Sequence, residues 1–573
     1  MTTGEVLLLA ARAGVTFWLE GDRLAYRAPE GRMTGELRDQ VISHKAELIA
    51  LLRQNRLEAA PPVASAPAPT DGPQDGPLAS GQERLWLLER RLGPSCLYNI
   101  HFRLVWRGTL DRGALALSLR DIVARHAAMR TAFTESDGVP RAIIAAGDDA
   151  GLQHVDLRDH PPQERKRAAG QLTLEHQREP FDLAAGPLYR VTVVTLADDD
   201  HIVLVTQHHI ITDGWSLRIF LAELGQGYRA HVLGGNPGPA EPPLRFADYV
   251  RWERQRRAEP GYTERLAWWK QHLAGLSPLA LHRVRPPGHG PADFHGAVRE
   301  FQVSTRLATR LKELAAERQC TLFTVLLTAW AILLHRHAGQ SDFAVGTVTS
   351  GRERPEFQPV LGFFANTIVM RCDLSGNPSA IEAITRLQAE TEAVFEREVP
   401  FSDIVLAAGA VRDTSLTPLI QAAFMFPKLP LPHFLGPDDA AGVGANVTAD
   451  ARIDGSVEGT AKFDLSLTME ETGDGITGSL EYATAIFSAT AVQRISEHFL
   501  VLLQSIVQNP HETIGRLRLM SREEQQRLLE EWSNPDAPSV QPRNSSAERQ
   551  ALLRWDELVK YSSRQREDNC VGD

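Results

Sequence analysis

A segment rich in proline, alanine, glycine and serine interrupts the chain early and limits how the rest can fold. Residues 58–77 contain almost no large apolar side chain. Such a composition favours a flexible, partly extended linker, because it cannot bury enough apolar surface to become ordered. At 573 residues the chain is also too long for one ordinary hydrophobic core. The sequence therefore predicts a small folded unit before the linker and a large one after it.

The small unit, residues 1–57, has the pattern of a β-hairpin flanked by helices, an αββα arrangement. The predicted elements are helices at 6–13 and 34–53, the second with Thr34 as its N-cap, and strands at 15–19 and 23–27 joined by a tight turn. A two-stranded hairpin leaves strand edges unpaired, and another chain can add a strand to such an edge.

The large unit, residues 78–534, mixes strand-like and helix-like patterns. The clearest strands are expected at 202–207, 367–371 and 463–468, and the clearest helices at 321–337 and 491–507. Strands alternating with helices over this length predict an α/β or α+β protein of two lobes, divided near residue 258 into 78–258 and 259–534. Residues 535–573 are expected to form a C-terminal tail.

Composition excludes several classes of function. The formal net charge of −11 argues against nucleic acid as the main partner, because phosphate binding needs a concentrated basic surface. No apolar run is long enough for a transmembrane helix, so no membrane partner is expected. The N-terminus lacks a secretion signal, and the four cysteines show no pairing pattern, so a reduced, cytoplasmic protein fits best.

The segment 206–216, Thr-Gln-His-His-Ile-Ile-Thr-Asp-Gly-Trp-Ser, carries the most chemical information. An apolar strand brings His208 and His209 to its end, where α/β proteins commonly place catalytic groups. Asp213 follows four residues later, and Gly214 permits a backbone turn that a Cβ would oppose. A helix is predicted to begin near Ser216.

The residues alone leave two interpretations of the histidine pair open. Adjacent strand residues point to opposite faces, so at most one histidine can face a given cleft; alternatively, both are hydrogen-bonded core residues. Two consecutive histidines cannot easily bind one metal ion from a strand, and no HExxH helix or cysteine cluster accompanies them. No metal site is expected.

Residues 206–216 match the HHxxxDG motif of non-ribosomal peptide synthetase condensation domains, and other segments resemble the remaining motifs of that family in order along the chain. These segments are 80–86 (SxAQxRLWxL), 125–133 (RHExLRTxF, with Ala127 where Glu is usual), 246–252 (YxDYAxW), 361–371 (IGxFVNTxxxR), 396–401 (HxDxPFExLV, with Glu396 in place of His) and 412–419 (RDxSRNPL). The large unit is identified as a member of this family.

The resemblance implies two chloramphenicol acetyltransferase-like lobes that form a V with a central tunnel. It also implies an acyltransferase of non-ribosomal or hybrid peptide biosynthesis, which joins a carrier-bound acyl or peptidyl thioester to an amine or hydroxyl. No cofactor is bound, and carrier proteins deliver the substrates on phosphopantetheine arms. Residues 1–57 separately resemble β-hairpin docking domains, which capture the C-terminal linear tail of an upstream carrier protein. Arg23, Arg27 and Arg32 are the candidate contacts to that often acidic tail.

By the same resemblance, His209 faces the tunnel, orients the nucleophile and takes its proton, whereas His208 packs behind the strand. Asp213 is expected to be structural, and a buried carboxylate normally has a cationic partner, for which Arg283 or Arg285 is the candidate. The amide of Gly214 is a candidate donor to the developing oxyanion.

Four further residues complete the predicted site as supporting residues. Trp215 is expected to pack rather than to contact substrate, and Ser216 follows it in the helix. Arg130 belongs to the 125–133 motif. Asn366 either lines the tunnel or has a structural role in its loop.

Related classes remain as alternatives. Epimerisation domains usually continue with Ser-Trp after the aspartate, whereas this chain has Gly214, Trp215 and Ser216, which favours condensation. A catalytically silent docking or scaffold protein on the same fold stays open, because Ala127 and Glu396 depart from the family pattern. No adenylate-forming loop or carrier-type serine is found, so a stand-alone enzyme is expected. Its acceptor would be held on a second carrier or be a free small molecule, in which case the enzyme releases the finished chain.

Overall fold

The computed structural model describes residues 16–20, 23–27, 33–45, 75–147, 151–235, 244–281, 294–410, 418–427, 445–451, 459–472 and 475–533. The chain divides into two compact units, Met1–Leu519 and Met520–Asp573. The second unit contains one described helix, α16 (Arg522–Ser533). The predicted helix at 6–13, Arg32, Arg283, Arg285 and the segment 412–417 lie outside the described residues, as does the predicted tail, 535–573.

The N-terminal segment contains the predicted hairpin. Strands β1 (Thr16–Glu20) and β2 (Arg23–Arg27) form an antiparallel two-stranded sheet that pairs Glu20 with Arg23, so only two residues connect them. Helix α2 (Gly35–Ser43) begins after Thr34, whose carbonyl accepts the amide hydrogen of Arg38. No third described strand joins this sheet. The hairpin and the start of the second helix are therefore confirmed.

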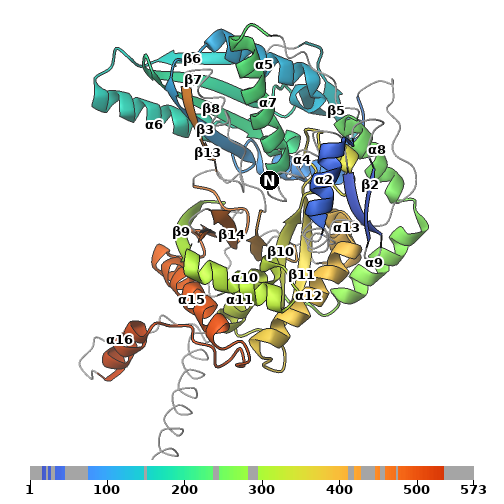
Figure 1. Cartoon of the computed structure of the whole chain (residues 1–573), viewed down its shortest axis with the longest axis vertical. Coiled ribbons are helices and arrows are strands. Elements are labelled where there is room, and N and C mark those ends of the chain that lie inside the picture. The colour runs from blue at the N-terminus through green and yellow to red at the C-terminus, as the bar shows by residue number, and fades with distance from the viewer. Residues whose placement is uncertain are drawn as a thin grey trace, which may run out of the picture. The chain divides into compact units, whose positions relative to one another are not determined.

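A five-stranded sheet forms the first large layer, in the order β13-β3-β8-β7-β6 (Figure 1). Its strands are β3 (Asn99–Gly108), β6 (Leu152–Asp156), β7 (Tyr189–Ala197), β8 (Asp200–His208) and β13 (Ala445–Ala451). Val203 and Val205 pack in one core with helices α5 (Arg112–Arg125) and α7 (Gly214–Val232). Leu204 packs in another core with α6 (Pro162–Arg178). The alternation along β8 therefore separates two buried faces.

Strand β13 crosses from the C-terminal half of the chain into this first sheet. It pairs antiparallel with β3, and Val447, opposite Trp106, is buried in the first core. The predicted division at residue 258 does not anticipate this exchange. The pairing supplies hydrogen-bond partners to the edge of β3 that would otherwise be unpaired, and no local sequence pattern predicts it.

The second sheet has six strands in the order β11-β10-β12-β14-β15-β9. These are β9 (Gly296–Ser304), β10 (Asp342–Thr349), β11 (Asn366–Asp373), β12 (Ala422–Met425), β14 (Leu465–Thr472) and β15 (Gly475–Ala483). Its core includes side chains from α10 (Thr305–Glu317), α11 (Leu322–Ala338), α12 (Ala380–Glu396) and α15 (Ala489–Gln508). The side chain of Thr321 caps α11 by accepting the Thr324 amide, as its position before an apolar helix favours. The strands and helices confirm the predicted α/β class.

A third, mostly aromatic core joins segments from both halves of the chain. Tyr249 and Trp252 of α8 (Phe246–Arg256) pack against Phe357 and Phe364 from the loops between β10 and β11. The ring centroids of Tyr249 and Phe364 are 4.5 Å apart. Nearby elements are α4 (Ser80–Leu92), α9 (Pro260–His272) and α13 (Phe401–Ala407), while β4 (Thr131–Ser136) and β5 (Val139–Ile144) form a separate hairpin.

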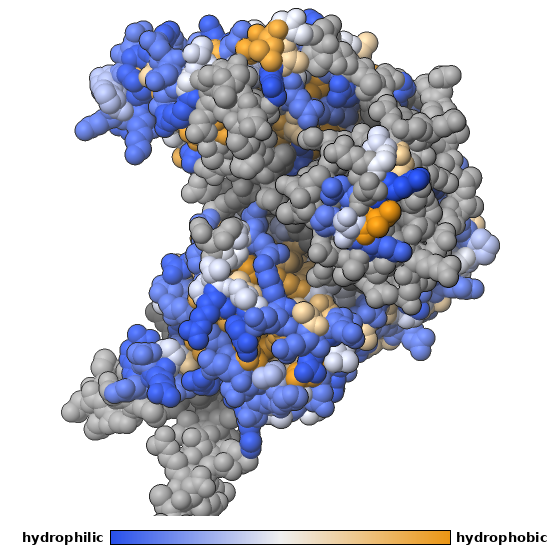
Figure 2. Space-filling view, in the orientation of Figure 1, coloured by the Kyte–Doolittle hydropathy of each residue, from blue (hydrophilic) through white to orange (hydrophobic). Residues whose placement is uncertain are grey.

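The face shown in Figure 2 is largely hydrophilic, with small separate apolar patches. Large apolar side chains that are exposed include Leu87, Leu233 and Leu406. Within the described ranges, no single helix has the length and apolar content to cross a membrane. Helices α10 and α11 reach that length and apolar content only together, and the pair is bent by 106°. The central tunnel stays a prediction.

Candidate active site

The end of β8 and the turn that follows it separate the two histidines. His208 is the last strand residue and shares its face with Thr206, toward α6. His209 begins the 3-10 turn η3 (His209–Ile211), so its side chain does not follow the alternating side-chain directions of the strand residues. The amide of His209 donates to the carbonyl of Tyr98 at 2.7 Å, which anchors the turn to the start of β3.

The imidazole of His209 has a defined tautomer. Its Nδ1 lies 2.8 Å from the carbonyl oxygen of Thr212. Because a carbonyl oxygen can only accept, Nδ1 carries the proton and Nε2 keeps its lone pair. Nε2 has no hydrogen-bond partner among the described residues, and the side chain is partly exposed. The ring meets the edge of Phe363, with centroids 4.9 Å apart. The ring is thus held in one orientation with Nε2 open.

The surroundings keep this ring neutral. Burial lowers the pKa of His209 to about 4, and the positive charge of Lys462 contributes to the lowering. At neutral pH the lone pair on Nε2 is therefore available to accept a proton.

His208 has a different environment. Its side chain is fully buried, and its Nδ1 accepts the amide hydrogen of Ile210 at 3.1 Å. It meets the edge of the Phe181 ring at 6.2 Å between centroids. Burial lowers the pKa of His208 to about 3, so it too is neutral. These contacts shape the turn behind His209.

Asp213 joins the turn after His209 to a distant loop. As the N-cap of α7, its Oδ1 accepts the amide of Ser216 at 2.7 Å. Its Oδ2 accepts the amides of Phe364 at 2.9 Å and Ala365 at 3.2 Å. The guanidinium of Arg352 lies 3.4 Å from Oδ1. The described cationic partner of Asp213 is thus Arg352, whereas the predicted candidates Arg283 and Arg285 lie outside the described residues.

The two residues after Gly214 contact the same distant region. The indole Nε1 of Trp215 donates to the carbonyl of Gln358 at 2.9 Å. The hydroxyl of Ser216 donates to the carbonyl of Gly362 at 2.6 Å and accepts from Arg352 at 2.7 Å. The start of α7 is therefore held by residues 352–365.

Gly214 is the first residue of α7 and does not have a left-handed φ. The predicted turn conformation is therefore not what requires a glycine here. Its amide lies at a helical position that has no intrahelical acceptor, which leaves it open to another acceptor.

Arg130 and Asn366 lie in separate surroundings. Arg130 donates to the carbonyls of Val123 at 3.0 Å and Ala145 at 2.8 Å, which ties the end of α5 to the strand β5. No hydrogen bond of Arg130 reaches residues 208–216. Asn366 donates to Glu398 at 2.9 Å and accepts the amide of Phe401 at 3.1 Å. It also lines a pocket that Phe363 borders.

Three residues near the site were not predicted from sequence: Arg352, Phe363 and Lys462. Arg352 follows Gly351, which lies two residues after the end of β10, and this is a weak local signal. Phe363 lies inside the 361–371 motif but at a variable position of it. Nothing local marks Lys462. Among the described residues, no group of three or more His, Cys, Asp or Glu side chains could hold a metal ion.

The chain matches two known family models. Residues 74–529 match the model of the condensation domain, and residues 5–54 match the TubC N-terminal docking domain. The chain is 35% identical over 541 residues to a linear gramicidin synthase protein of Brevibacillus parabrevis, covering 92% of this chain and 10% of that protein. It is 34% identical over 510 residues to phosphinothricin tripeptide synthetase PhsB of Streptomyces viridochromogenes, covering 86% of this chain and 42% of that protein.

These relatives are longer proteins, and the chain spans about a tenth of the length of the first and less than half of the second. Solved structures share the fold. The X-domain from teicoplanin biosynthesis has a TM-score of 0.70 at 23% identity, over 80% of this chain and 100% of that one. The first condensation domain of the CDA synthetase has a TM-score of 0.61 at 20% identity, over 78% and 99%.

Family members of this kind act on carrier-bound thioesters, and a docking domain implies interaction with partner synthetase proteins. The HHxxxDG turn and the two family matches lead to one conclusion: this chain belongs to the condensation domain family of non-ribosomal peptide synthesis and carries a TubC-type docking domain at its N-terminus.

Proposed function

We propose that the chain transfers an acyl or peptidyl group from a carrier-bound thioester to an amine or hydroxyl acceptor, with His209 as the general base. The neutral ring of His209 carries the proposal, because Thr212 holds Nδ1 and leaves Nε2 open. The acceptor attacks the thioester carbonyl, and Nε2 takes the acceptor's proton. The tetrahedral centre then collapses, the C–S bond breaks, and the pantetheine thiolate leaves and is protonated.

Positioning contributes beside proton transfer. Well-aligned groups reach effective molarities of roughly 10⁵–10⁸ M, whereas a general base adds about 10²–10⁴-fold. The start of α7 supports a developing oxyanion, because Gly214 contributes an amide without an intrahelical acceptor. Asp213 acts as a positioning residue that holds this helix start against the 361–366 loop.

The nature of the acceptor decides how much the base matters. An α-amine has a pKa of about 8, so part of it is already unprotonated at neutral pH. An alcohol has no such reactive fraction. With His209→Ala we therefore expect ester formation to fall by about 10²–10⁴-fold and amide formation by a smaller factor.

The test offers a loaded upstream carrier protein together with matched amine and alcohol acceptors, and follows products by mass spectrometry. His160→Ala is the control, because His160 is exposed and lies on a loop before α6. Equal losses for the two acceptors would refute the general-base role. Carrier binding without any turnover by the wild type would favour the catalytically silent scaffold instead.

We propose further that the β1–β2 sheet captures the C-terminal tail of an upstream carrier protein by strand addition. Support comes from the two-stranded sheet, to which no third described strand is paired. Arg23 and Arg27 belong to β2, so they lie on an element that such a tail would contact.

Replacing both Arg23 and Arg27 by Glu should weaken binding of an acidic tail peptide at least tenfold at low salt, and have little effect on binding of a neutral peptide. An unchanged affinity for the acidic peptide would refute these two contacts.

A further inference from the structure

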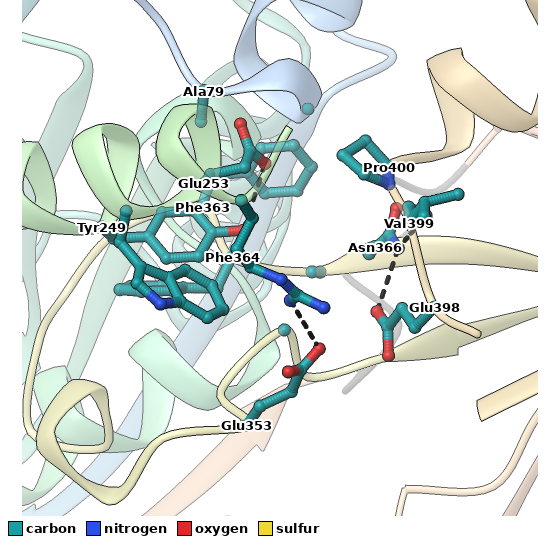
Figure 3. A pocket seen from close by; sticks show the side chains of 15 residues that line it. Ala79, Tyr249, Glu253, Glu353, Phe363, Phe364, Asn366, Glu398, Val399 and Pro400 are labelled. Atoms are coloured by element: carbon teal, nitrogen blue, oxygen red, sulfur yellow. Dashed lines mark hydrogen bonds and ion pairs between the residues drawn. The ribbon is translucent and has the colours of Figure 1, made fainter. Parts of the chain in front are cut away.

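Figure 3 shows a pocket with about 40 Å³ of space, which is lined by residues that include Tyr249, Glu398 and Phe363. Phe363 borders both the pocket and the candidate active site, because it lines the pocket and also meets the ring of His209. The volume suits one small group, such as an ammonium or a water molecule or two. The pocket is lined by aromatic and acidic side chains, which include Tyr249, Trp252, Glu253, Glu353, Phe363 and Glu398.

Two of its three carboxylates have strong partners. Glu253 accepts both the amide and the hydroxyl of Ser80 at 2.8 Å. Glu353 pairs with Arg256 at 3.0 Å, and this is the ion pair drawn in Figure 3. Arg256 is also the one guanidinium among the described residues that line the pocket.

Glu398, like Glu253 and unlike Glu353, is hydrogen-bonded only to neutral groups. Its Oε1 accepts the hydroxyl of Thr349 at 2.6 Å and the side-chain amide of Asn366 at 2.9 Å. Its Oε2 has no hydrogen-bond partner, and no cation forms an ion pair with this carboxylate, among the residues that the structure describes. Burial, with the nearby charge of Glu353, raises the pKa of Glu398 to about 7. Three carboxylates thus line the pocket beside the single guanidinium of Arg256, and a cation bound there would stabilise the ionised form of Glu398.

The other walls favour an organic cation. The rings of Tyr249, Trp252 and Phe364 line the pocket, and aromatic faces attract alkylammonium groups. A metal ion such as Mg²⁺ or Ca²⁺ would instead require about six oxygen ligands. Trp252 is only 7% exposed, yet its Nε1 has no acceptor among the described residues. A buried indole N–H of this kind can donate to an oxygen of a bound molecule or to a water molecule.

We propose that this pocket binds the side-chain ammonium of a basic acceptor whose nucleophilic amine lies at His209. The inference rests on the proposed condensation function and adds a substrate class to it. Because Phe363 both lines the pocket and meets the ring of His209, the ammonium in the pocket and the nucleophilic amine at His209 are distinct groups of one acceptor. Glu398 is then the specificity-determining carboxylate, and Phe363 sets the separation between the two groups.

The test compares L-ornithinamide with L-norleucinamide, which have the same length and differ by a terminal ammonium in place of a methyl group. A charged hydrogen bond contributes about 1.5–3 kcal/mol, so we expect kcat/KM to favour ornithinamide by roughly 10- to 100-fold in the wild type. In Glu398→Gln the ratio should fall to near one, while the hydrogen bonds from Thr349 and Asn366 can persist. Glu317→Gln, an exposed carboxylate on α10, is the matched control and should keep the wild-type ratio.

Calorimetric binding of the two amides separates this inference from the proposed function. If no amide forms but ornithinamide binds more tightly than norleucinamide, and Glu398→Gln abolishes the difference, the pocket assignment stands and the condensation proposal fails. If amides form with equal efficiency from both acceptors, the pocket assignment fails and condensation stands. A preference that Glu398→Gln leaves intact would also overturn the assignment.

Discussion

Arg352 Nη2 lies 3.4 Å from Asp213 Oδ1, and both side chains are almost completely buried. The two residues are 139 positions apart in the chain. Arg352 also donates to the carbonyls of Phe357 and Val360, at 2.6 and 2.7 Å. The pair therefore fixes the helix start behind His209 to the loops before β11.

Removing this carboxylate should be costly. Asp213→Ala leaves the Arg352 charge buried without its partner and the amides of Phe364 and Ala365 without an acceptor. Because breaking a buried pair costs about 3–5 kcal/mol, we expect the free energy of unfolding to fall by that amount. Urea denaturation followed by tryptophan fluorescence measures it. Asp198→Ala removes an exposed ion pair with Arg158 and should change stability by less than about 1 kcal/mol. A similar small loss for both variants would contradict the assigned role.

The low pKa of His209 predicts an unusual pH profile. A base must be unprotonated to act, and His209 remains so down to a pH of about 4. With a weakly basic acceptor such as methoxyamine, kcat/KM should therefore stay nearly constant between about pH 7 and pH 5. Initial rates in constant-ionic-strength buffers test this. An acid limb centred near pH 6.5 would show an unperturbed imidazole and refute the prediction.

The buried histidines should make the fold sensitive to acid. Burial lowers the pKa of both His176 and His208 to about 3, whereas unfolded histidine titrates near 6.5. Between these values the unfolded chain binds protons that the folded chain does not, so stability falls as the pH is lowered. Each histidine contributes up to about 1.4 kcal/mol per pH unit.

In His176→Leu the free energy of unfolding should therefore fall less steeply with decreasing pH, by up to about 1.4 kcal/mol per pH unit. This change in slope is independent of any change in stability at neutral pH. The exposed His160→Leu serves as control. Urea midpoints measured from about pH 7 to pH 4 give the slope. An identical slope in wild type and His176→Leu would rule out this source of acid sensitivity.

Gly351 should not tolerate a side chain. Its φ is 64°, and a Cβ would lie 2.0 Å from the carbonyl oxygen of Phe364. The left-handed conformation alone costs a residue with a Cβ about 1–2 kcal/mol, and the clash with backbone adds to it. We expect Gly351→Ala to destabilise the protein by more than about 2 kcal/mol and to lower turnover, since Arg352 is adjacent.

The matched control is Gly170→Ala in α6, where a Cβ would meet nothing within 4 Å. Alanine in a helix should be neutral or stabilising by up to about 1 kcal/mol. Thermal unfolding of the two variants beside the wild type provides the comparison. Equal melting temperatures for Gly351→Ala and the wild type would show that the loop can rearrange at little cost.

The sequence by itself determined the features that depend on near neighbours. The apolar run before His208 predicted a strand at 202–207, and β8 covers Asp200–His208. The apolar pattern at 321–337 predicted a helix, and α11 covers Leu322–Ala338. The tight turn predicted at 20–22 lies between the paired residues Glu20 and Arg23. The ordered motifs identified the family because they occur within such local elements. A strand end, a cap or a tight turn is set by residues a few positions apart, so its pattern can be read directly.

The tertiary structure decided which distant residues complete the site. Only the folded chain brings Arg352 to Asp213, Phe363 to His209 and the strand β13 to β3. Only the folded chain buries His209 near Lys462 and Glu398 near Glu353, which lowers the pKa of His209 and raises that of Glu398. These properties arise from packing between segments that are far apart in the sequence, and charge energies depend on the solvent that such packing excludes. No local pattern contains that information.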